Sequence, residues 1–591
     1  MSNKGSEFFS RISRGLKGNL PWVLIGLAVS ASQWGCARDF NINRPLPPGV
    51  HEKLRKATTL QEEHLLKRQV KLDEVPPEHK GEIFERAETI AVDKKKPETR
   101  EGGSKTAETL DIELPEALKV TVENNLGLQT SAFNPAIAEQ NLRVEQAKYE
   151  AVLAASTVYT KTNTASSSGS GYQPPGSGSI VNTHTYNFTP TVKIPAQSGG
   201  TVNLNLPSYT RVNTGAYGTF SPATTLETPA VGFGLTQPLL RGGGFKVTNA
   251  SIETAKLKLL QSDSALKLAT IRLLANVEQA YWDYYGAYEN LKIEVAQYDR
   301  ARQQANLARR LVEEGVRTKV EMTRAETGVA RQFQDVLLAE GLRRRTENNL
   351  KRLMNRADLP LESETIIIPK TGPRLEGLFF DRVRIIELAL QNRMELLDNE
   401  LQQAIDRVAV FMNKNAVLPN LLFNFNYSYS GSKPKFGDAL DQLLNDYLTT
   451  YNFSLTAELP LQGNRAAKAK LRASVLSQQQ NQANRKVLEQ SIKQEVLDAL
   501  DAAEKNWQRI LANRTAVMLA SETYESEIIE FQNGFSTSTD VLTALTTMAD
   551  AETALVAAIV DHQKALVDIA FATGTVFGSG GVVWIPGKAA E

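Results

Sequence analysis

Two halves of this 591-residue chain repeat one another at a fixed internal spacing. Val277-Glu-Gln-Ala-Tyr281 begins 38 residues before Gly315, and Val496-Leu-Asp-Ala-Leu500 begins the same 38 residues before Gly534. Self-similarity of this kind means that one structural unit occurs twice, so the fold has to accommodate two equivalent units. Because no residue has been gained or lost between these landmarks, both units are expected to end at one level.

Both copies contain long segments without proline, from Leu239 to Leu359 and from Leu461 to Ile585, although the chain has 24 prolines. Apolar residues in them recur every three or four positions, which is the seam of a coiled coil. In the first copy this seam is Val277, Tyr281, Tyr284, Tyr288, Leu291, Val295 and Tyr298. The pattern predicts two helical hairpins that break at the glycines, with helices over 248–314 and 319–355, then 465–533 and 539–572. A helix of roughly 67 residues reaches on the order of 100 Å.

Strict alternation of side chains marks the segments that precede each hairpin. Apolar residues from Leu421 to Tyr429 alternate with Leu422, Asn424, Asn426, Ser428 and Ser430, and the return segment 451–459 alternates in the same way. In the first copy, Val231, Phe233 and Leu235 match the return strand, and 156–163 is a weaker outgoing strand. A membrane barrel strand requires this pattern, with lipid on one face and water on the other. Two strands per copy cannot close a barrel, so several chains have to pool their strands.

An insertion distinguishes the first copy from the second. Leu128 matches Leu396 at an offset of 268 residues and Pro238 matches Pro460 at 222, so the first copy carries 46 extra residues. They include a Gly/Ser-rich stretch, 166–179, and alternating apolar residues around Gly199-Gly200 that predict an additional hairpin within 164–229. The sequence leaves open whether this hairpin adds strands to the barrel or forms an extracellular loop.

Composition excludes several classes of function. Lysine plus arginine (67) balances aspartate plus glutamate (66), so the chain has no excess positive charge that would favour nucleic acid as a partner. The single cysteine and five scattered histidines predict neither a disulfide framework nor a metal site. No nucleophile elbow, P-loop or metal motif occurs, and we expect no enzyme activity and no cofactor.

The N-terminus has the layout of a secretory signal peptide, with basic residues before the apolar stretch Leu20 to Val29. Cleavage after Val29-Ser30-Ala31 would suit the ordinary peptidase, whereas Gly35-Cys36 resembles a lipoprotein site, with Cys36 as the lipidated residue. We assign 1–36 to the signal peptide. The charged, proline-rich segment 37–109 is expected to be a disordered linker, with one short helix near Leu54 to Val70.

Together these residues resemble the TolC-type outer-membrane efflux protein family over about Leu114 to Val576. The resemblance rests on Ala389-Leu-Gln-Asn-Arg393, Thr236-Gln-Pro-Leu-Leu-Arg-Gly242, the paired Gly-x-x-Thr-x-x-(Glu/Asp) breaks and Ala572-Thr-Gly-Thr575. It implies an α+β membrane protein, in which a trimeric β-barrel with about four strands per chain continues into a long α-helical coiled-coil tunnel in the periplasm. It also implies a passive export duct for tripartite efflux or type I secretion. Such a duct is a homotrimer whose barrel is embedded in outer-membrane lipid. The expected partners are a periplasmic adaptor (membrane fusion) protein and an inner-membrane RND or ABC transporter.

The resemblance also implies functional positions at the helical tips. The adaptor-contact residues are Gly315, Thr318, Gly534 and Thr537. Asp540 falls on the first position of the aspartate ring that closes the pore, whereas Thr543, Phe531 and Ser536 replace the second acid, the tyrosine and the arginine of the family's lock. Glu321, the first-copy equivalent of Asp540, and Arg317 are expected to form a substitute link. The alternative left open is that Asp540 simply caps its helix as a solvated acid.

These patterns divide the chain into five segments. After the signal peptide (1–36) and the linker (37–109) come the first repeat, 110–372 with its helical hairpin 247–355, and the second repeat, 373–576 with strands 420–459 and hairpin 464–573. The C-terminal tail is 577–591. A structural envelope lipoprotein tether without channel activity is the alternative function, because long helices and a lipid would also serve a tether.

Overall fold

The computed structural model describes residues 66–71, 109–166, 179–217 and 224–579. The chain divides into two compact units, each built from separate stretches. Of the described residues, one unit contains 138–166, 179–217, 224–259 and 402–481, and the other contains 66–71, 109–137, 260–401 and 482–579. The expected signal peptide with Cys36, most of the expected linker and residues 580–591 of the tail lie outside the described residues.

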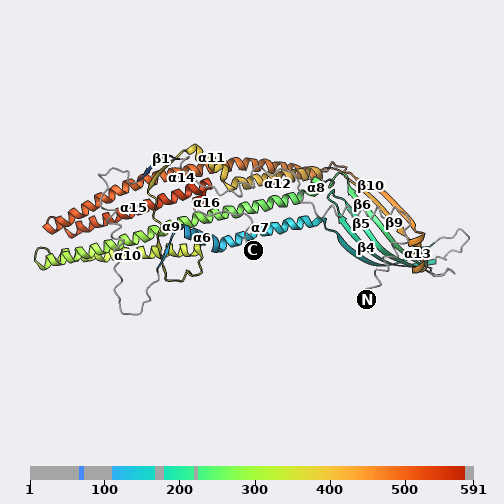
Figure 1. Ribbon diagram of the computed structural model, residues 1–591, viewed down its shortest axis with the longest axis horizontal. Helices are drawn as coiled ribbons and strands as arrows, with labels where there is room; N and C mark the ends of the chain where they lie inside the picture. The colour runs from blue at the N-terminus through green and yellow to red at the C-terminus, as the bar shows by residue number, and fades with distance from the viewer. Residues whose placement is uncertain (1–65, 72–108, 167–178, 218–223, 580–591) are drawn as a thin grey trace. The chain divides into compact units, whose positions relative to one another are not determined.

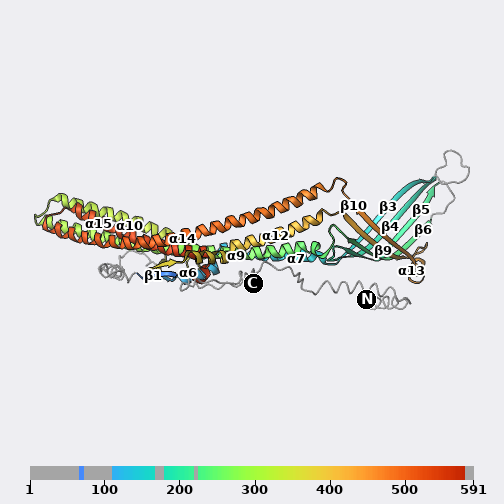
Figure 2. The same ribbon diagram turned by 90° about the horizontal axis from the view of Figure 1, so that it is seen from above.

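The first unit is built on one antiparallel sheet of six strands in the order β10-β9-β6-β5-β4-β3 (Figures 1 and 2). The strands are β3 (Val152–Ser166), β4 (Ser179–Pro195), β5 (Thr201–Tyr217), β6 (Thr224–Pro238), β9 (Asn420–Ser430) and β10 (Leu448–Glu458). The sheet therefore has six strands per chain where the resemblance implied about four. The difference is the inserted hairpin, because β4 and β5 join the sheet between β3 and β6. The expected outgoing strand 156–163 is also longer, since β3 has 15 residues.

Three short elements also belong to this unit. They are the 3-10 turn η3 (Ala147–Tyr149), helix α8 (Phe245–Thr248) and helix α13 (Phe436–Asn445), which lies between β9 and β10 in sequence. Helix α13 packs on β6 and β9, and its Phe436 ring meets Tyr209 of β5 edge to face at 5.4 Å. The β9–β10 connection is thus held against the sheet.

Long helices make up most of the second unit, although helical residues 138–146, 250–259, 402–416 and 465–481 belong to the first unit. Two hairpins fold back on themselves at glycine turns (Figure 1). The first pairs α9 (Ala250–Glu313) with α10 (Lys319–Met354), and the second pairs α14 (Arg465–Asn533) with α15 (Ser538–Thr573). These bounds lie within two residues of those expected from the sequence. The shorter helices are α6 (Leu114–Asn124), α7 (Leu126–Gln146), α11 (Arg382–Asn392), α12 (Met394–Ala416) and α16 (Val576–Ser579).

Two small sheets belong to the second unit as well. Strand β2 (Thr109–Ile112) pairs in parallel with β7 (Ile366–Pro369), and β1 (Leu66–Lys71) pairs antiparallel with β8 (Glu376–Phe380). The helix expected near Leu54 to Val70 is therefore wrong over Leu66–Val70. Pairing with β8 gives this segment backbone hydrogen bonds that a linker sequence does not reveal.

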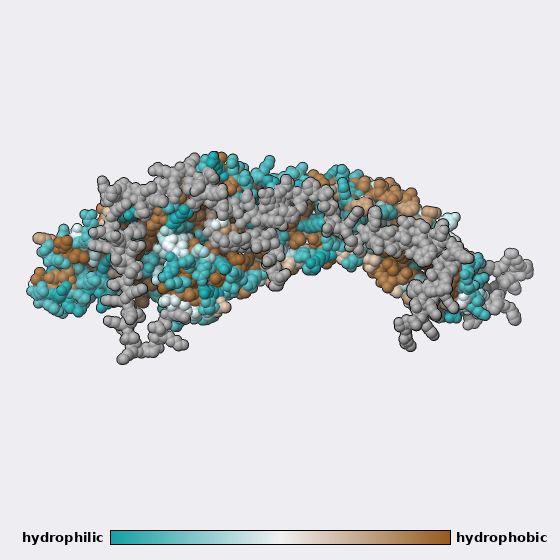
Figure 3. Space-filling view, viewed as in Figure 1, coloured by the Kyte–Doolittle hydropathy of each residue, from teal (hydrophilic) through white to brown (hydrophobic). Residues whose placement is uncertain are grey.

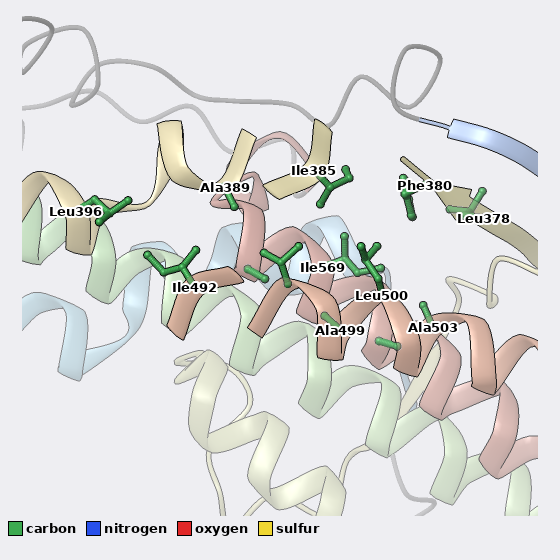
Figure 4. Packing of buried hydrophobic residues seen from close by; sticks show 13 residues of the cluster. Leu378, Phe380, Ile385, Ala389, Leu396, Ile492, Ala499, Leu500, Ala503 and Ile569 are labelled. Carbon is green, nitrogen blue, oxygen red and sulfur yellow. The ribbon is translucent and has the colours of Figure 1, made fainter. Parts of the chain in front are cut away.

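The core of the second unit contains a cluster drawn from α11, α12, α14, α15 and β8 (Figure 4). Ile385 and Ala389 of α11 are fully buried and pack with Val496 of α14 and Ile569 of α15. Five of the 13 buried residues of the cluster are alanines, and their small side chains let the helices approach closely. In the part of the chain that the structure describes, α15 is also the one helix long and apolar enough to cross a membrane, but its apolar residues supply this core.

Two of the motifs that carry the family resemblance meet in this core. The buried Arg393 guanidinium pairs with Glu395 at 3.0 Å and Glu495 at 2.9 Å, and it lies over the Phe571 ring. Gly574 ends α15 at φ +70°, and a Cβ there would approach Asn392 to 3.3 Å. The Asn-Arg end of α11 and the Thr-Gly-Thr end of α15 therefore fix each other.

Candidate functional site: strand faces and helical tips

The six-stranded sheet has one apolar face. A single register row crosses all six strands and consists of Tyr451, Tyr427, Phe233, Leu204, Val192 and Leu153. On β10 the side chains of this face stay open to the surroundings, with Tyr451, Phe453 and Leu455 each more than 60% exposed. Hydrophobic residues gather over the strands in Figure 3. An exposed apolar surface of this extent marks an interaction site, and a strand of about 11 residues has the length that crosses a bilayer.

The opposite face of the sheet is small and polar. The adjacent row consists of Thr450, Ser428, Gly232, Asn205, Thr191 and Ala154. Glycines on β6 leave room for the amides on either side, since a Cβ at Gly234 would stand 2.7 Å from Asn426 Oδ1 and 3.7 Å from Asn203 Cβ. The sheet thus presents lipid-compatible side chains on one face and water-compatible side chains on the other.

Each helical hairpin of the second unit reverses at a glycine in the left-handed region. Gly315 has φ +76° and Gly534 has φ +91°, and neither would crowd a neighbour with a Cβ. Glycine is therefore needed at both positions for its backbone conformation and not for lack of space, because residues with a Cβ are strained at such angles. Thr318 and Thr537 then stand at the N-caps of α10 and α15.

Arg317 joins the tip of the first hairpin to that of the second. Its Nη2 donates to the carbonyl oxygens of Phe531 at 2.6 Å and Ser536 at 2.9 Å, and its guanidinium lies 4.6 Å from the centroid of the buried Phe531 ring. Carbonyls at the end of a helix carry partial negative charge and lack partners within the helix. Arg317 thus caps the C-terminal end of α14.

Glu321 makes the second connection between the tips. Its Oε2 accepts a hydrogen bond from the backbone N–H of Ser538 at 2.7 Å, and its Oε1 pairs with Arg324 at 2.8 Å. Ser538 is the first residue of α15, and both Ser538 and Glu321 are buried. The carboxylate therefore caps the N-terminus of α15 from the neighbouring hairpin. We call Arg317, Glu321 and the backbone groups that they bind on the second hairpin the tip clasp.

Asp540 belongs to a capping box at the start of α15. Its Oδ2 accepts from the backbone N–H of Thr537 at 2.9 Å and from the Thr537 hydroxyl at 2.7 Å, while the Asp540 N–H donates back to that hydroxyl. These hydrogen bonds from Thr537 lower the pKa of Asp540, which is exposed. The residue therefore stays charged even in mildly acidic solution. The capping role that the sequence left open is present.

The link expected between Glu321 and Arg317 takes a different form, because Glu321 pairs with Arg324 and both residues bind the second hairpin. The structure brings together Arg317, Glu321, Phe531 and Thr537 with the two glycine turns. Sequence reasoning missed Ser536 and Ser538 as partners, since their contribution is a backbone carbonyl and a backbone N–H. The available signal in the sequence was positional. Arg317 lies two residues after Gly315, and Ser536 lies two residues after Gly534.

Comparison with known proteins decides the family. The sequence profile described as "Outer membrane efflux protein" matches residues 207–356 and 385–575, more than half of the chain. The chain belongs to the outer membrane efflux protein family. The fold is that of outer-membrane efflux channels, and this family membership places the protein in the outer membrane. A search of curated protein sequences finds no significant match.

Solved structures show the same fold at low sequence identity. A structure of CusC is 15% identical with a TM-score of 0.57 and covers 80% of this chain and 95% of its own. A membrane protein from Pseudomonas aeruginosa is 17% identical with a TM-score of 0.57, covering 81% and 96%. The MtrE outer-membrane channel of Neisseria gonorrhoeae, described in its open state, is 18% identical with a TM-score of 0.54, covering 80% and 91%. Membership of this efflux family and its fold are thus shown by independent comparisons.

Proposed function

We propose that this family member is the outer-membrane duct of a tripartite efflux or type I secretion system, assembled from three copies of the chain. The observation that carries the proposal is the sheet, whose apolar face is exposed on both edge strands. In the described residues each edge strand pairs on one side only, β3 with β4 and β10 with β9. Open sheet edges are not tolerated in lipid, so the edges of one copy have to meet those of another. A duct of this kind is passive and performs no catalysis.

The helical tips are proposed to dock onto a periplasmic adaptor protein, which connects the duct to an RND or ABC transporter. Support comes from the geometry of the reversals at Gly315 and Gly534. Beside these turns the apolar side chains of Val316 and Phe535 are 58% and 85% exposed, and exposed apolar surface at the end of a hairpin suits a protein contact. An adaptor would cover them.

The gate is proposed to involve the tip clasp and Asp540. The clasp connects the two hairpins of one protomer and would hold their tips together in the closed duct. Asp540 is exposed and ionised, and in a trimer its carboxylates would form a ring that concentrates negative potential and favours cations. Cys36 is proposed as a lipid attachment that would anchor the chain further.

Ion conductance tests the duct. The purified protein, reconstituted in planar bilayers, is expected to be trimeric and to show discrete single-channel steps after the tips are loosened by Arg317→Ala. A matched preparation with Arg309→Ala, which removes an exposed ion pair within the first hairpin alone, is expected to remain as closed as the unaltered chain. A trimer that conducts under none of these conditions would leave the envelope tether as the function.

A further inference from the structure

The inserted hairpin β4–β5 occupies the interior of the sheet. Strand β4 pairs with β3 along all 15 residues of β3, and β5 pairs with β6 from Thr201 to Thr214. In the described residues β3 therefore meets β6 only through the hairpin. Removing a pair of interior strands would leave two open edges in the middle of the sheet, which makes the hairpin a structural part of the wall.

The turn of the hairpin lies at the end of the sheet where β6 leads toward helix α9. Ser198 Oγ donates to Gln237 Oε1 at 2.7 Å, Gln237 Nε2 donates to the Ser198 carbonyl at 3.0 Å, and the Gly244 N–H donates to the same carbonyl at 2.8 Å. Gly199, at φ +89°, has no room for a Cβ, which would stand 2.4 Å from the Gly242 carbonyl oxygen. An extracellular loop would not return to this end, so β4 and β5 run the full height of the sheet.

Both faces of the sheet continue through the hairpin without interruption. Leu204 and Val192 fill the apolar row between Phe233 and Leu153, while Asn205 and Thr191 fill the polar row beside it. A shift of one residue in the pairing register of β4 or β5 would place the apolar side chains of that strand on the polar face of the sheet. The single register irregularity, near Pro207 of β5, lies beyond these rows and toward the end away from the turn.

The two edge strands of the sheet have the relative direction that barrel closure needs. The six strands alternate in direction, so β3 at one edge and β10 at the other run antiparallel. Strand β10 of one copy can therefore pair with β3 of the next, and repetition of this contact closes a ring. An even number of strands per copy preserves the alternation for any number of copies.

We propose that the hairpin β4–β5 is part of the barrel wall, and that three copies of the chain close a barrel of 18 strands. The proposal rests on the trimeric duct proposed above. Barrel diameter grows about linearly with strand number, so this barrel is roughly 1.5 times as wide as one built from four strands per copy. With strands about 4.8 Å apart and tilted by about 40°, the backbone diameter is about 36 Å rather than about 24 Å. Barrels of 16–18 strands hold an aqueous channel, so the outer exit admits bulkier cargo than a narrower barrel does.

Cysteine accessibility tests the wall directly. Asn203→Cys and Leu204→Cys, neighbours on β5, are reconstituted separately in lipid vesicles as full-length trimers and treated with a charged, membrane-impermeant maleimide. Asn426→Cys and Phe425→Cys on β9 are the matched controls, and the unaltered chain reports the background from Cys36. We expect strong labelling at Asn203→Cys and Asn426→Cys, and at least tenfold weaker labelling at Leu204→Cys and Phe425→Cys.

The outcomes separate the hairpin from the duct. One outcome is that labelling differs between the two β9 positions as expected while both β5 positions are labelled, or neither is. In that case the hairpin lies outside the wall and the 18-stranded barrel is refuted, although a duct remains. If β9 itself fails to alternate, the barrel and the proposed function fall together. A cross-section of the unaltered trimer by electron cryomicroscopy provides a second measurement free of substitutions. Eighteen strands support the proposal and twelve overturn it.

Discussion

Replacement of Arg317 by alanine is expected to loosen the tip of the second hairpin although Arg317 belongs to the first. The substitution removes two hydrogen bonds from a charged donor, to the carbonyls of Phe531 and Ser536, and the contact with the Phe531 ring. Charged hydrogen bonds contribute about 1.5–3 kcal/mol each when buried, and Arg317 is half-buried, so about 1 kcal/mol for each is appropriate. The ring contact adds about 1 kcal/mol. The tip should therefore open more easily by about 3 kcal/mol.

Native-state hydrogen exchange measures this effect at named amides. The N–H groups of Gly534 and Phe535 bind the carbonyls of Phe531 and Glu530 at the end of α14, so their exchange reports opening of that end. Since about 1.4 kcal/mol corresponds to a factor of ten, exchange in Arg317→Ala should be ~100-fold faster there.

Arg309→Ala is the control for Arg317→Ala. It removes an exposed pair with Glu326 at 3.0 Å inside the first hairpin, which contributes about 0–1 kcal/mol. Exchange at Gly534 and Phe535 should then change less than fivefold. An equal effect of both variants, or none from Arg317→Ala, would refute the clasp as a connection between hairpins.

Three further perturbations follow from the second unit. Asp540→Asn retains an acceptor for Thr537 but removes the charge, so single-channel cation preference should fall while the melting temperature stays nearly constant; an unchanged preference at neutral pH would remove Asp540 from the pore. Gly534→Ala should cost about 1–2 kcal/mol in thermal unfolding because of its φ of +91°, whereas Gly341→Ala in the middle of α10, where a Cβ meets nothing, should stabilise by up to about 1 kcal/mol. Burial raises the pKa of Glu278 to about 7, so its contribution to stability declines as pH rises from about 4.5 through 7, by up to about 3 kcal/mol. Glu278→Gln should therefore raise the melting temperature at pH 8 and leave it unchanged at pH 4.5; equal shifts at both pH values would contradict burial as the cause.

The long helices could be predicted from the sequence because their signals are local. Absence of proline permits them, the heptad seam gives their period, and the glycines at 315 and 534 end them. The inserted hairpin is different, because its alternation is the same whether it lies in a barrel wall or in a loop. What decides its place is the pairing of β4 with β3 and of β5 with β6, together with the Ser198–Gln237 contact across 39 residues of chain. Such long-range hydrogen bonds leave no pattern in a short window.

The tip clasp was hidden for another reason. A search for paired side chains looks for an acid beside a base, and Glu321 with Arg317 was the natural candidate. The structure instead directs Arg317 at two carbonyl oxygens and Glu321 at an N–H group. Backbone groups have no residue identity, so helix ends act as charged partners that composition does not display.

The duplicated tip motif therefore has two different roles in the two copies. Asp540 folds back onto Thr537, the N-cap of its own helix, whereas the aligned Glu321 reaches the start of α15 in the other hairpin. The Thr318 side chain accepts no capping hydrogen bond. The extra methylene of glutamate makes the longer reach possible. In a trimer the clasp would join the first hairpin of each protomer to the second hairpin of the same protomer. It would not join the hairpins of neighbouring protomers. Asp540 is exposed and ionised at this level, so mutual repulsion of its carboxylates would act at the tips that the clasp does not join. Loss of this repulsion in Asp540→Asn should lower the open probability of the trimer, whereas loss of the clasp in Arg317→Ala should raise it.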